Sequence, residues 1–177
     1  MSNMITNPKS AAWPASLAAA TVLGSWALAC VFPFAAMAAL AALTMNRRAG
    51  LATVATIWAA NQFVGFFILS FPWDAQALGH GIAILGCTLA GFAAARFVAG
   101  RIAIGSALRS VASLAASFAV YLALMRVYAQ FGGGAENFTL EINAAVALND
   151  ALWFAGLMAL RFVLSAVTGE KPLPATA

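Results

Sequence analysis

Long apolar runs, separated by short polar or charged segments, dominate the 177-residue chain. A helix that crosses a bilayer needs about 20 apolar residues, because each residue adds about 1.5 Å to a hydrocarbon core about 30 Å thick. Four runs have this length, at residues 51–71, 79–98, 107–128 and 142–167. Their Ala- and Leu-rich sequences lack the two-residue alternation of membrane barrel strands. The pattern therefore predicts transmembrane α-helices.

The first apolar stretch, residues 11–45, is too long for one ordinary span and short for two. Pro33 lies inside it, and an interior proline removes a helical hydrogen bond and clashes with the preceding turn. We therefore expect two short helices, 11–30 and 33–46, joined by a tight turn. The predicted fold is an all-α integral membrane protein, a compact bundle of six transmembrane helices forming a single domain over residues 1–177. Five helices are the alternative.

Composition and charge support a membrane location. The chain is 64% hydrophobic and 8% charged, and no soluble core of this size could bury so much apolar surface. The net charge of +4 comes from basic residues spread between apolar runs, which indicates topology rather than a nucleic-acid surface. Arg47, Arg48, Arg101 and Lys171 would lie on the cytoplasmic side with both termini, and the connections 71–80 and 129–141 outside. The lipid bilayer is the expected partner, and no nucleic acid is.

Polar residues inside apolar spans are costly in lipid and are therefore candidates for function. Asn61 and Gln62 lie near the middle of the third span, Asn143 and Asp150 in the sixth, and Arg126 near the outer end of the fifth. Interhelical hydrogen bonds and an Arg126–Asp150 ion pair would explain them all. They could equally line a cavity that opens to the outer side.

Two outer connections mix aromatic residues, polar groups and glycines. The first contains Phe71, Trp73 and Asp74, and the second contains Phe131 and Asn137 beside three consecutive glycines. Aromatic residues at a membrane interface are ordinary anchors. The same mixture, with a glycine hinge, also suits a lid over a ligand.

His80 is the only histidine and lies between two glycines at the start of the fourth predicted span. Neutral imidazole is a good ligand for cobalt-like metals. One histidine cannot form a metal site alone, but it could supply one axial ligand to a metal held in a macrocycle. A helix-end residue wetted by the interface is the alternative interpretation.

Several classes of protein are disfavoured by the motifs. The chain has no G-x-x-x-x-G-K-[ST] phosphate loop, so it cannot use ATP by itself. It has no H-E-x-x-H or G-x-S-x-G motif, and its intramembrane acids and bases are too few for a recognisable relay. We do not expect an enzyme, an intrinsic cofactor or a protein-only metal site.

Small residues recur every four positions in two spans. Ala11, Ala15 and Ala19 form one ladder, and such stripes let helices approach closely in lipid. This ladder could pack within the chain or dock a separate membrane subunit. A second stripe, Gly86, Ala90 and Ala94, is interpreted as packing within the chain.

Six short helices in under 200 residues, the Ala ladder and the ligand-like outer loops resemble the S-components of energy-coupling factor (ECF) vitamin transporters. Within that family the chain looks most like the small proteobacterial cobalamin-transporting group, the BtuM type. The resemblance implies a bacterial cytoplasmic membrane protein that captures a vitamin, cobalamin or another corrinoid, from outside and moves it inward. It also implies that Ala11, Ala15 and Ala19 dock on a T-component, which works with ECF ATPases.

The chain departs from that group at the ligand for cobalt. The group presents a cysteine from the loop after the third helix, whereas Cys87 lies inside the fourth predicted helix and His80 occupies the loop region. The resemblance therefore implies His80 as the axial ligand. The residues expected to bind substrate are His80, Asp74, Trp73, Phe71, Asn61, Gln62, Arg126, Phe131, Asn137, Asn143 and Asp150. A non-catalytic membrane assembly subunit is the alternative function, and a metal-ion permease is a third.

Overall fold

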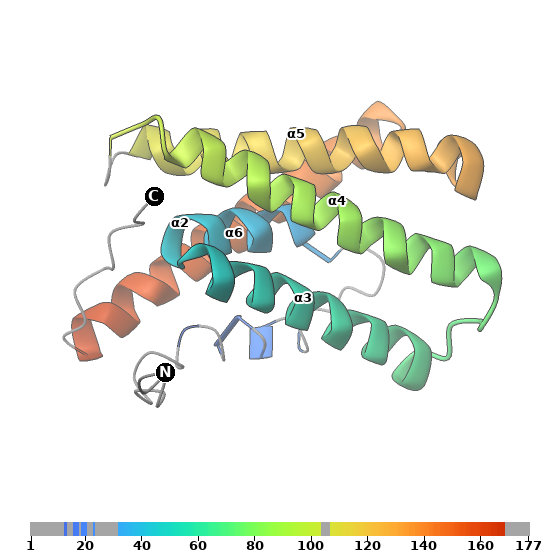
Figure 1. The fold of residues 1–177 in the computed structure, drawn as a ribbon, viewed down its shortest axis with the longest axis horizontal. Helices are drawn as coiled ribbons and strands as arrows, with labels where there is room; N and C mark the ends of the chain where they lie inside the picture. The colour runs from blue at the N-terminus through green and yellow to red at the C-terminus, as the bar shows by residue number, and fades with distance from the viewer. Residues whose placement is uncertain are drawn as a thin grey trace.

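The computed structural model describes Trp13, Ser16, Leu17, Ala19, Ala20 and Leu23 near the N-terminus, and residues 32–103 and 107–168. All regular structure in this part of the chain is helical (Figure 1). The elements are α2 (Phe34–Thr44), α3 (Arg47–Phe63), the π-helix η1 (Val64–Ile68), α4 (Ala75–Ala99), α5 (Ala107–Gly132), the 3-10 turn η2 (Ala135–Asn137) and α6 (Leu140–Thr168). Most of the first expected span, 11–30, including Ala11 and Ala15, lies outside the described residues.

Four helical segments of the described part are long and apolar enough to cross a membrane. They are Arg47–Ile68, Ala75–Ala99, Ala107–Gly132 and Leu140–Val167, with lengths of 22 to 28 residues. At about 1.5 Å per residue, each exceeds the hydrocarbon thickness of about 30 Å. The chain is therefore a multi-pass helical membrane protein.

Helix α2 occupies the centre of the bundle and packs against α3, α4, α5 and α6 (Figure 1). Ten of its 11 residues are buried. Its length is about 16 Å at the standard rise, much less than a bilayer core. Its many alanines allow the surrounding helices to approach closely. The expected span 33–46 is thus a short core helix, and it starts directly after Pro33, as the sequence predicts.

Helices α4 and α5 run side by side along much of their length (Figure 1). Gly91 makes this possible, because a Cβ there would lie 2.9 Å from Ser117 Oγ and 3.1 Å from the Ser117 carbonyl oxygen. The sequence pointed to the stripe beginning at Gly86 instead. That prediction is wrong at Gly86, which is exposed, and no heavy atom of the described residues lies within 4 Å of a Cβ built there.

Helix α4 begins four residues earlier than the sequence predicts, at Ala75 rather than residue 79. Asp74 caps it, its side chain accepting a hydrogen bond from Ala77 N at 2.7 Å and satisfying one of the free donors of the first turn. His80 therefore lies in the second turn of a helix and not in a loop, which corrects the sequence-based placement.

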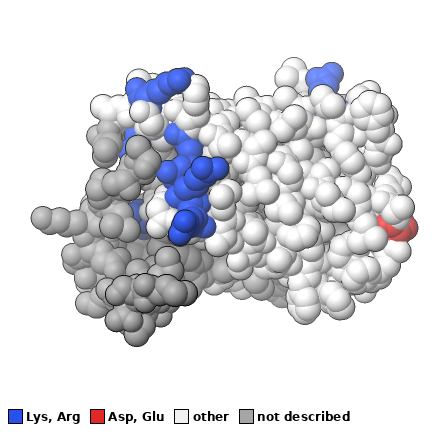
Figure 2. Space-filling view, viewed as in Figure 1, with Lys and Arg blue, Asp and Glu red and all other residues white. Residues whose placement is uncertain are grey.

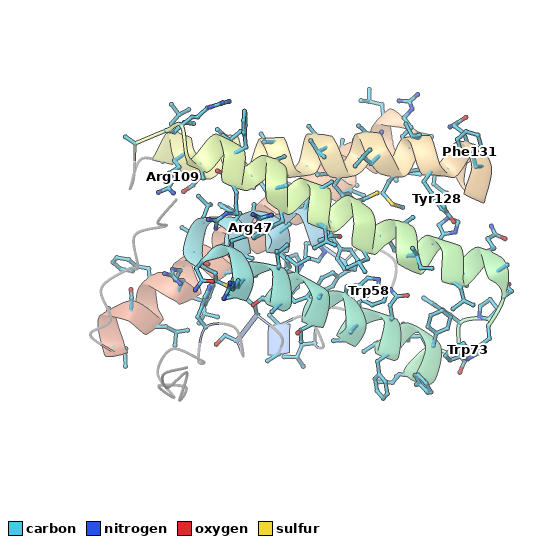
Figure 3. The ribbon with its side chains drawn as sticks, in the orientation of Figure 1. Arg47, Trp58, Trp73, Arg109, Tyr128 and Phe131 are labelled. Atoms are coloured by element: carbon cyan, nitrogen blue, oxygen red, sulfur yellow. The ribbon has the colours of Figure 1, made fainter. Side chains whose placement is uncertain are left out.

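Charged and aromatic side chains separate along the bundle. Most of the Lys and Arg surface in Figure 2 gathers towards one end of the molecule. In Figure 3, Arg47 and Arg109 lie towards that end, whereas Trp73, Tyr128 and Phe131 lie at the other. This is the distribution that the basic-side rule of membrane topology describes.

Candidate functional site

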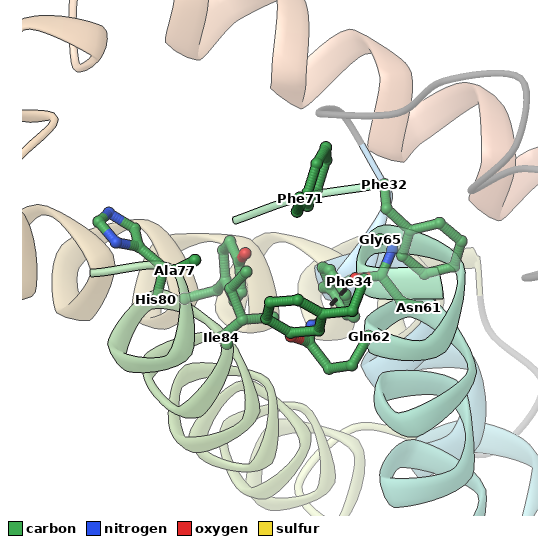
Figure 4. A pocket seen from close by; sticks show the side chains of 12 residues that line it. Phe32, Phe34, Asn61, Gln62, Gly65, Phe71, Ala77, His80 and Ile84 are labelled. Atoms are coloured by element: carbon green, nitrogen blue, oxygen red, sulfur yellow. Dashed lines mark hydrogen bonds between the residues drawn. The ribbon is translucent and has the colours of Figure 1, made fainter. Parts of the chain in front are cut away.

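A cavity of about 210 Å³ lies between the start of α2, the end of α3, η1, the first turns of α4 and the middle of α5 (Figure 4). Most of the residues that line it are aromatic or carry an amide, and the others are small or aliphatic: Phe32, Phe34, Asn61, Gln62, Gly65, Phe66, Phe71, Ala77, His80, Gly81, Ile84 and Tyr121. Four of the expected substrate-binding residues are among them: Phe71, Asn61, Gln62 and His80.

Stacked and edge-on rings form one wall of the cavity. Phe32 meets Phe34 edge-on, with ring centroids 4.7 Å apart. Phe34 in turn lies nearly parallel to Tyr121, with centroids 6.3 Å apart and an interplanar angle of 21°. Such surfaces favour flat apolar groups, because aromatic contacts add to the gain from burying apolar area.

Polar contacts join α3 to α4 beside this wall. Trp58 Nε1 donates to the Gly81 carbonyl oxygen at 2.7 Å. Gln62 Nε2 donates to Asn61 Oδ1 at 3.2 Å, while Gln62 Oε1 lies so close to Gly81 that a side chain there would displace it. Because Gly81 has no side chain, the Gln62 amide can lie against the surface of α4. Polar groups in lipid need such partners.

The π-helix η1 turns the chain so that Phe71 folds back over the cavity. The backbone N–H of Leu69 bonds to Val64 O at 2.9 Å, and that of Phe71 bonds to Gly65 O at 3.0 Å. Ser70, with φ of 57°, adopts a left-handed conformation that L side chains rarely take. A Cβ on Gly65 would lie 3.0 Å from the Phe71 ring, so the glycine accommodates that ring. π-helical turns of this kind occur often at functional sites.

The imidazole of His80 is held by a carbonyl oxygen of its own helix. Its Nδ1 lies 2.9 Å from the Gln76 carbonyl oxygen, which can only accept, so Nδ1 carries a proton, and in the neutral ring Nε2 is then the nitrogen with a lone pair. The Tyr128 ring packs edge-on against it, with centroids 5.0 Å apart. Nε2 faces the turn after α5, since a Cβ built on Gly134 would lie 3.8 Å away. In Figure 4 His80 and Asn61 lie at opposite edges of the cavity.

Two expected binding residues of the first outer loop have other contacts. Asp74 caps α4 and does not line the cavity. Trp73 stacks on Phe66 at 4.4 Å and meets Phe67 edge-on at 5.5 Å. Trp73 is 63% exposed, which suits an aromatic anchor at the membrane interface.

The expected residues on the α5–α6 side do not line the cavity either. Arg126, Phe131 and Asn137 are exposed at the surface. Asn143 Nδ2 donates to the Phe138 carbonyl oxygen at 3.4 Å, which connects the start of α6 to the preceding turn.

Asp150 is buried, with 2% of its surface exposed, but it faces the start of α2. Its Oδ1 accepts a hydrogen bond from Ala36 N at 2.6 Å. The sequence suggested an ion pair with Arg126, whereas the hydrogen bond found is with a backbone N–H of another helix. Nearby, Ser117 Oγ donates to the Ala35 carbonyl oxygen at 2.9 Å.

Several lining residues were missed from the sequence, most notably Phe34, Phe66 and Tyr121. Phenylalanines in an apolar span look like lipid-facing residues, so sequence alone gives no reason to select them. Tyr121 carried a usable signal, because its hydroxyl is a polar group within the fifth apolar run.

The size of the cavity limits what it can enclose. Pockets that enclose drug-sized ligands usually measure about 300–1,000 Å³, so about 210 Å³ accommodates a ring-sized group rather than a whole macrocycle. Within the described part of the chain, no group of three or more His, Cys, Asp or Glu side chains could hold a metal ion. No protein-family model, curated protein or solved structure matches this chain.

Proposed function

We propose that this protein is a vitamin-uptake protein of a bacterial cytoplasmic membrane that captures a corrinoid, such as cobalamin, from the outer side and passes it inward. The observation that carries the proposal is the His80 imidazole, which lines a cavity walled by aromatic rings and is oriented by the Gln76 carbonyl oxygen at Nδ1. Neutral imidazole is a suitable axial ligand for cobalt that a macrocycle already holds.

The corrin ring would rest over the outer mouth of the cavity, because the cavity is too small to enclose it. The turn containing Gly133 and Gly134 now lies in front of His80 Nε2, so it must move aside when a corrinoid binds. Both glycines have positive φ, 85° and 88°, and conformations of this kind are readily adopted by glycine alone. A ring-sized substituent could then enter between Phe34 and Phe71.

The N-terminal segment has an exposed face on which a docking partner could bind. Trp13 and Leu17 are buried against the bundle, whereas Ala19 and Leu23 are exposed. The face that carries Ala19 therefore points away from the bundle, where a T-component could bind it. Ala11 and Ala15, the other members of the ladder, lie outside the described residues. An ECF ATPase module bound through that component could drive release.

Titration of the purified chain in lipid nanodiscs with hydroxocobalamin tests the proposal. Replacement of cobalt-bound water by His80 should change the visible absorption of the corrinoid, and His80→Ala should abolish that change. Trp73→Phe is the matched control, because Trp73 lies in the same region without lining the cavity. If neither hydroxocobalamin nor any other compound in a vitamin panel binds, the proposal fails.

A permanent assembly subunit is the second candidate, favoured by the broad apolar faces of α5 and α6. Leu108 and Val111 on α5, and Leu152 and Phe162 on α6, are each more than 60% exposed. Lipid or another membrane subunit could cover these faces. Co-purification with a fixed partner, unaffected by Gln62→Ala, would favour this function over vitamin capture.

A further inference from the structure

Asp150 differs from the other described carboxylates in its burial. Asp74, Glu136 and Glu141 are exposed, whereas Asp150 lies inside the bundle in the first half of α6. A charge at such a depth is expensive in a membrane protein and commonly marks an ion or proton pathway.

The groups around Asp150 come from three other helices. Helix α2 has no ionisable side chain and presents only its first-turn backbone, through Ala36 N. Helix α5 contributes Tyr121, on which both Asp150 and the Cys87 thiol of α4 act electrostatically. The hydrogen bond that Asp150 accepts from Ala36 N comes from the positive end of α2, which stabilises its negative charge.

A capping role alone does not account for an aspartate at this position. Asn or Ser caps a helix as well as Asp does, without placing a charge in the bundle interior. Aspartate differs from both because it can exist in two charge states. The ionised carboxylate holds the N-terminus of α2, and the neutral acid binds it less strongly, because both the charge–dipole attraction and the charge-assisted hydrogen bond weaken.

The start of α2 is also part of the cavity. Phe34, the first residue of α2, lines the cavity and stacks on Tyr121. Ala36, whose N–H bonds to Asp150, follows two residues later. A change in how Asp150 holds α2 therefore changes the position of an aromatic wall of the ligand site.

We propose that Asp150 is a proton-binding site that couples entry of the ligand to inward movement of one proton. In each cycle the carboxylate takes up a proton from the outer side, forming one O–H bond, and loses the same proton to the inner side. No other reactant is consumed. This inference rests on the proposed uptake function for its ligand, and it goes further by naming the proton gradient as the source of energy for entry of the ligand.

Transport by the reconstituted full-length chain tests the coupling. Proteoliposomes with a lumen more alkaline than the medium should accumulate labelled cobalamin by up to about tenfold per pH unit, the limit for one proton per ligand. A protonophore should abolish the gradient-driven part. Asp150→Asn, which is uncharged at every pH, should still bind cobalamin, but with an affinity that does not change with pH, and it should lose the response to the gradient. Uptake that ignores the imposed gradient in the wild type would overturn the proposal.

Infrared difference spectroscopy tests the protonation itself and needs no ligand. Acidification of the wild type should produce the carbonyl band of a buried neutral carboxyl group, and Asp150→Asn should lack this band. Glu141→Gln is the matched control, because Glu141 is an exposed carboxylate on the same helix. Identical spectra for Asp150→Asn and the wild type would overturn the inference even if cobalamin binds. If cobalamin does not bind but the band is present, only the uptake function fails.

Asp150→Asn should fold, because the amide oxygen can still accept the Ala36 N–H. Asp150→Glu provides a second variant, since it restores a titratable carboxyl group. It should recover the infrared band, and its absence there would count against Asp150 as the proton site.

Discussion

Two glycines of α4 show how much a single methyl group can matter at a helix crossing. Gly91 faces the backbone and side chain of Ser117, which cannot both move away, whereas Gly86 is exposed. Gly91→Ala should destabilise the protein by about 1–3 kcal/mol through overpacking. Gly86→Ala should be neutral or stabilising by up to about 1 kcal/mol, because alanine favours the helix.

Thermal unfolding of the two variants in the same detergent measures this difference directly. Equal effects on the midpoint temperature would show that the close crossing at Gly91 does not determine packing between α4 and α5.

Residue by residue, the sequence could predict those site residues that are chemically out of place. Asn61 and Gln62 are amides within an apolar span, and His80 is the only histidine, so the sequence alone marks each of them. Phe34 and Phe66 could not, because an apolar ring is equally suited to lipid and to a cavity wall. Only the packing of α2 against α5 brings Phe34 to Tyr121.

Among the secondary-structure elements, the N-terminus of α4 determines where His80 lies. Asp74→Ala should cost about 0.5–2 kcal/mol of stability through loss of the helix cap, whereas Asp74→Asn should retain most of the cap. Because Asp74 does not line the cavity, ligand affinity should change little in Asp74→Asn.

Unfolding temperatures and a binding titration on both variants check this expectation. A large loss of affinity in a stable Asp74→Asn would instead mean that Asp74 contacts the ligand.

Element boundaries followed from the sequence where a strong local signal marks them. Pro33 fixed the start of α2, because proline cannot continue a preceding helix. The start of α4 was misplaced, because residues 75–78 include a glutamine and the apolar run that marks the predicted span begins only at residue 79. The π-turn η1 had no sequence signal, since it depends on how Phe71 packs against Gly65.

For the molecule as a whole, the separation of basic and aromatic ends predicts its orientation in the membrane. In a background without Cys30 and Cys87, a cysteine replacing Glu136 should react with an impermeant thiol reagent added outside intact cells. A cysteine replacing Arg101 should react only after the membrane is opened. Both positions are exposed, so burial does not account for a difference. Equal reactivity from outside would contradict the predicted orientation.

The burial of α2 has a consequence for how the protein is made. The acceptor of the Ala36 N–H, Asp150, is 114 residues further along the chain, so it reaches the membrane long after α2 has been synthesised. Until then the Ala36 N–H at the start of α2 lacks its hydrogen-bond acceptor, and lipid offers no acceptor in its place. Nascent chains that end before α6 should therefore be held by the insertion machinery or degraded, and complete synthesis becomes a condition for stable membrane integration.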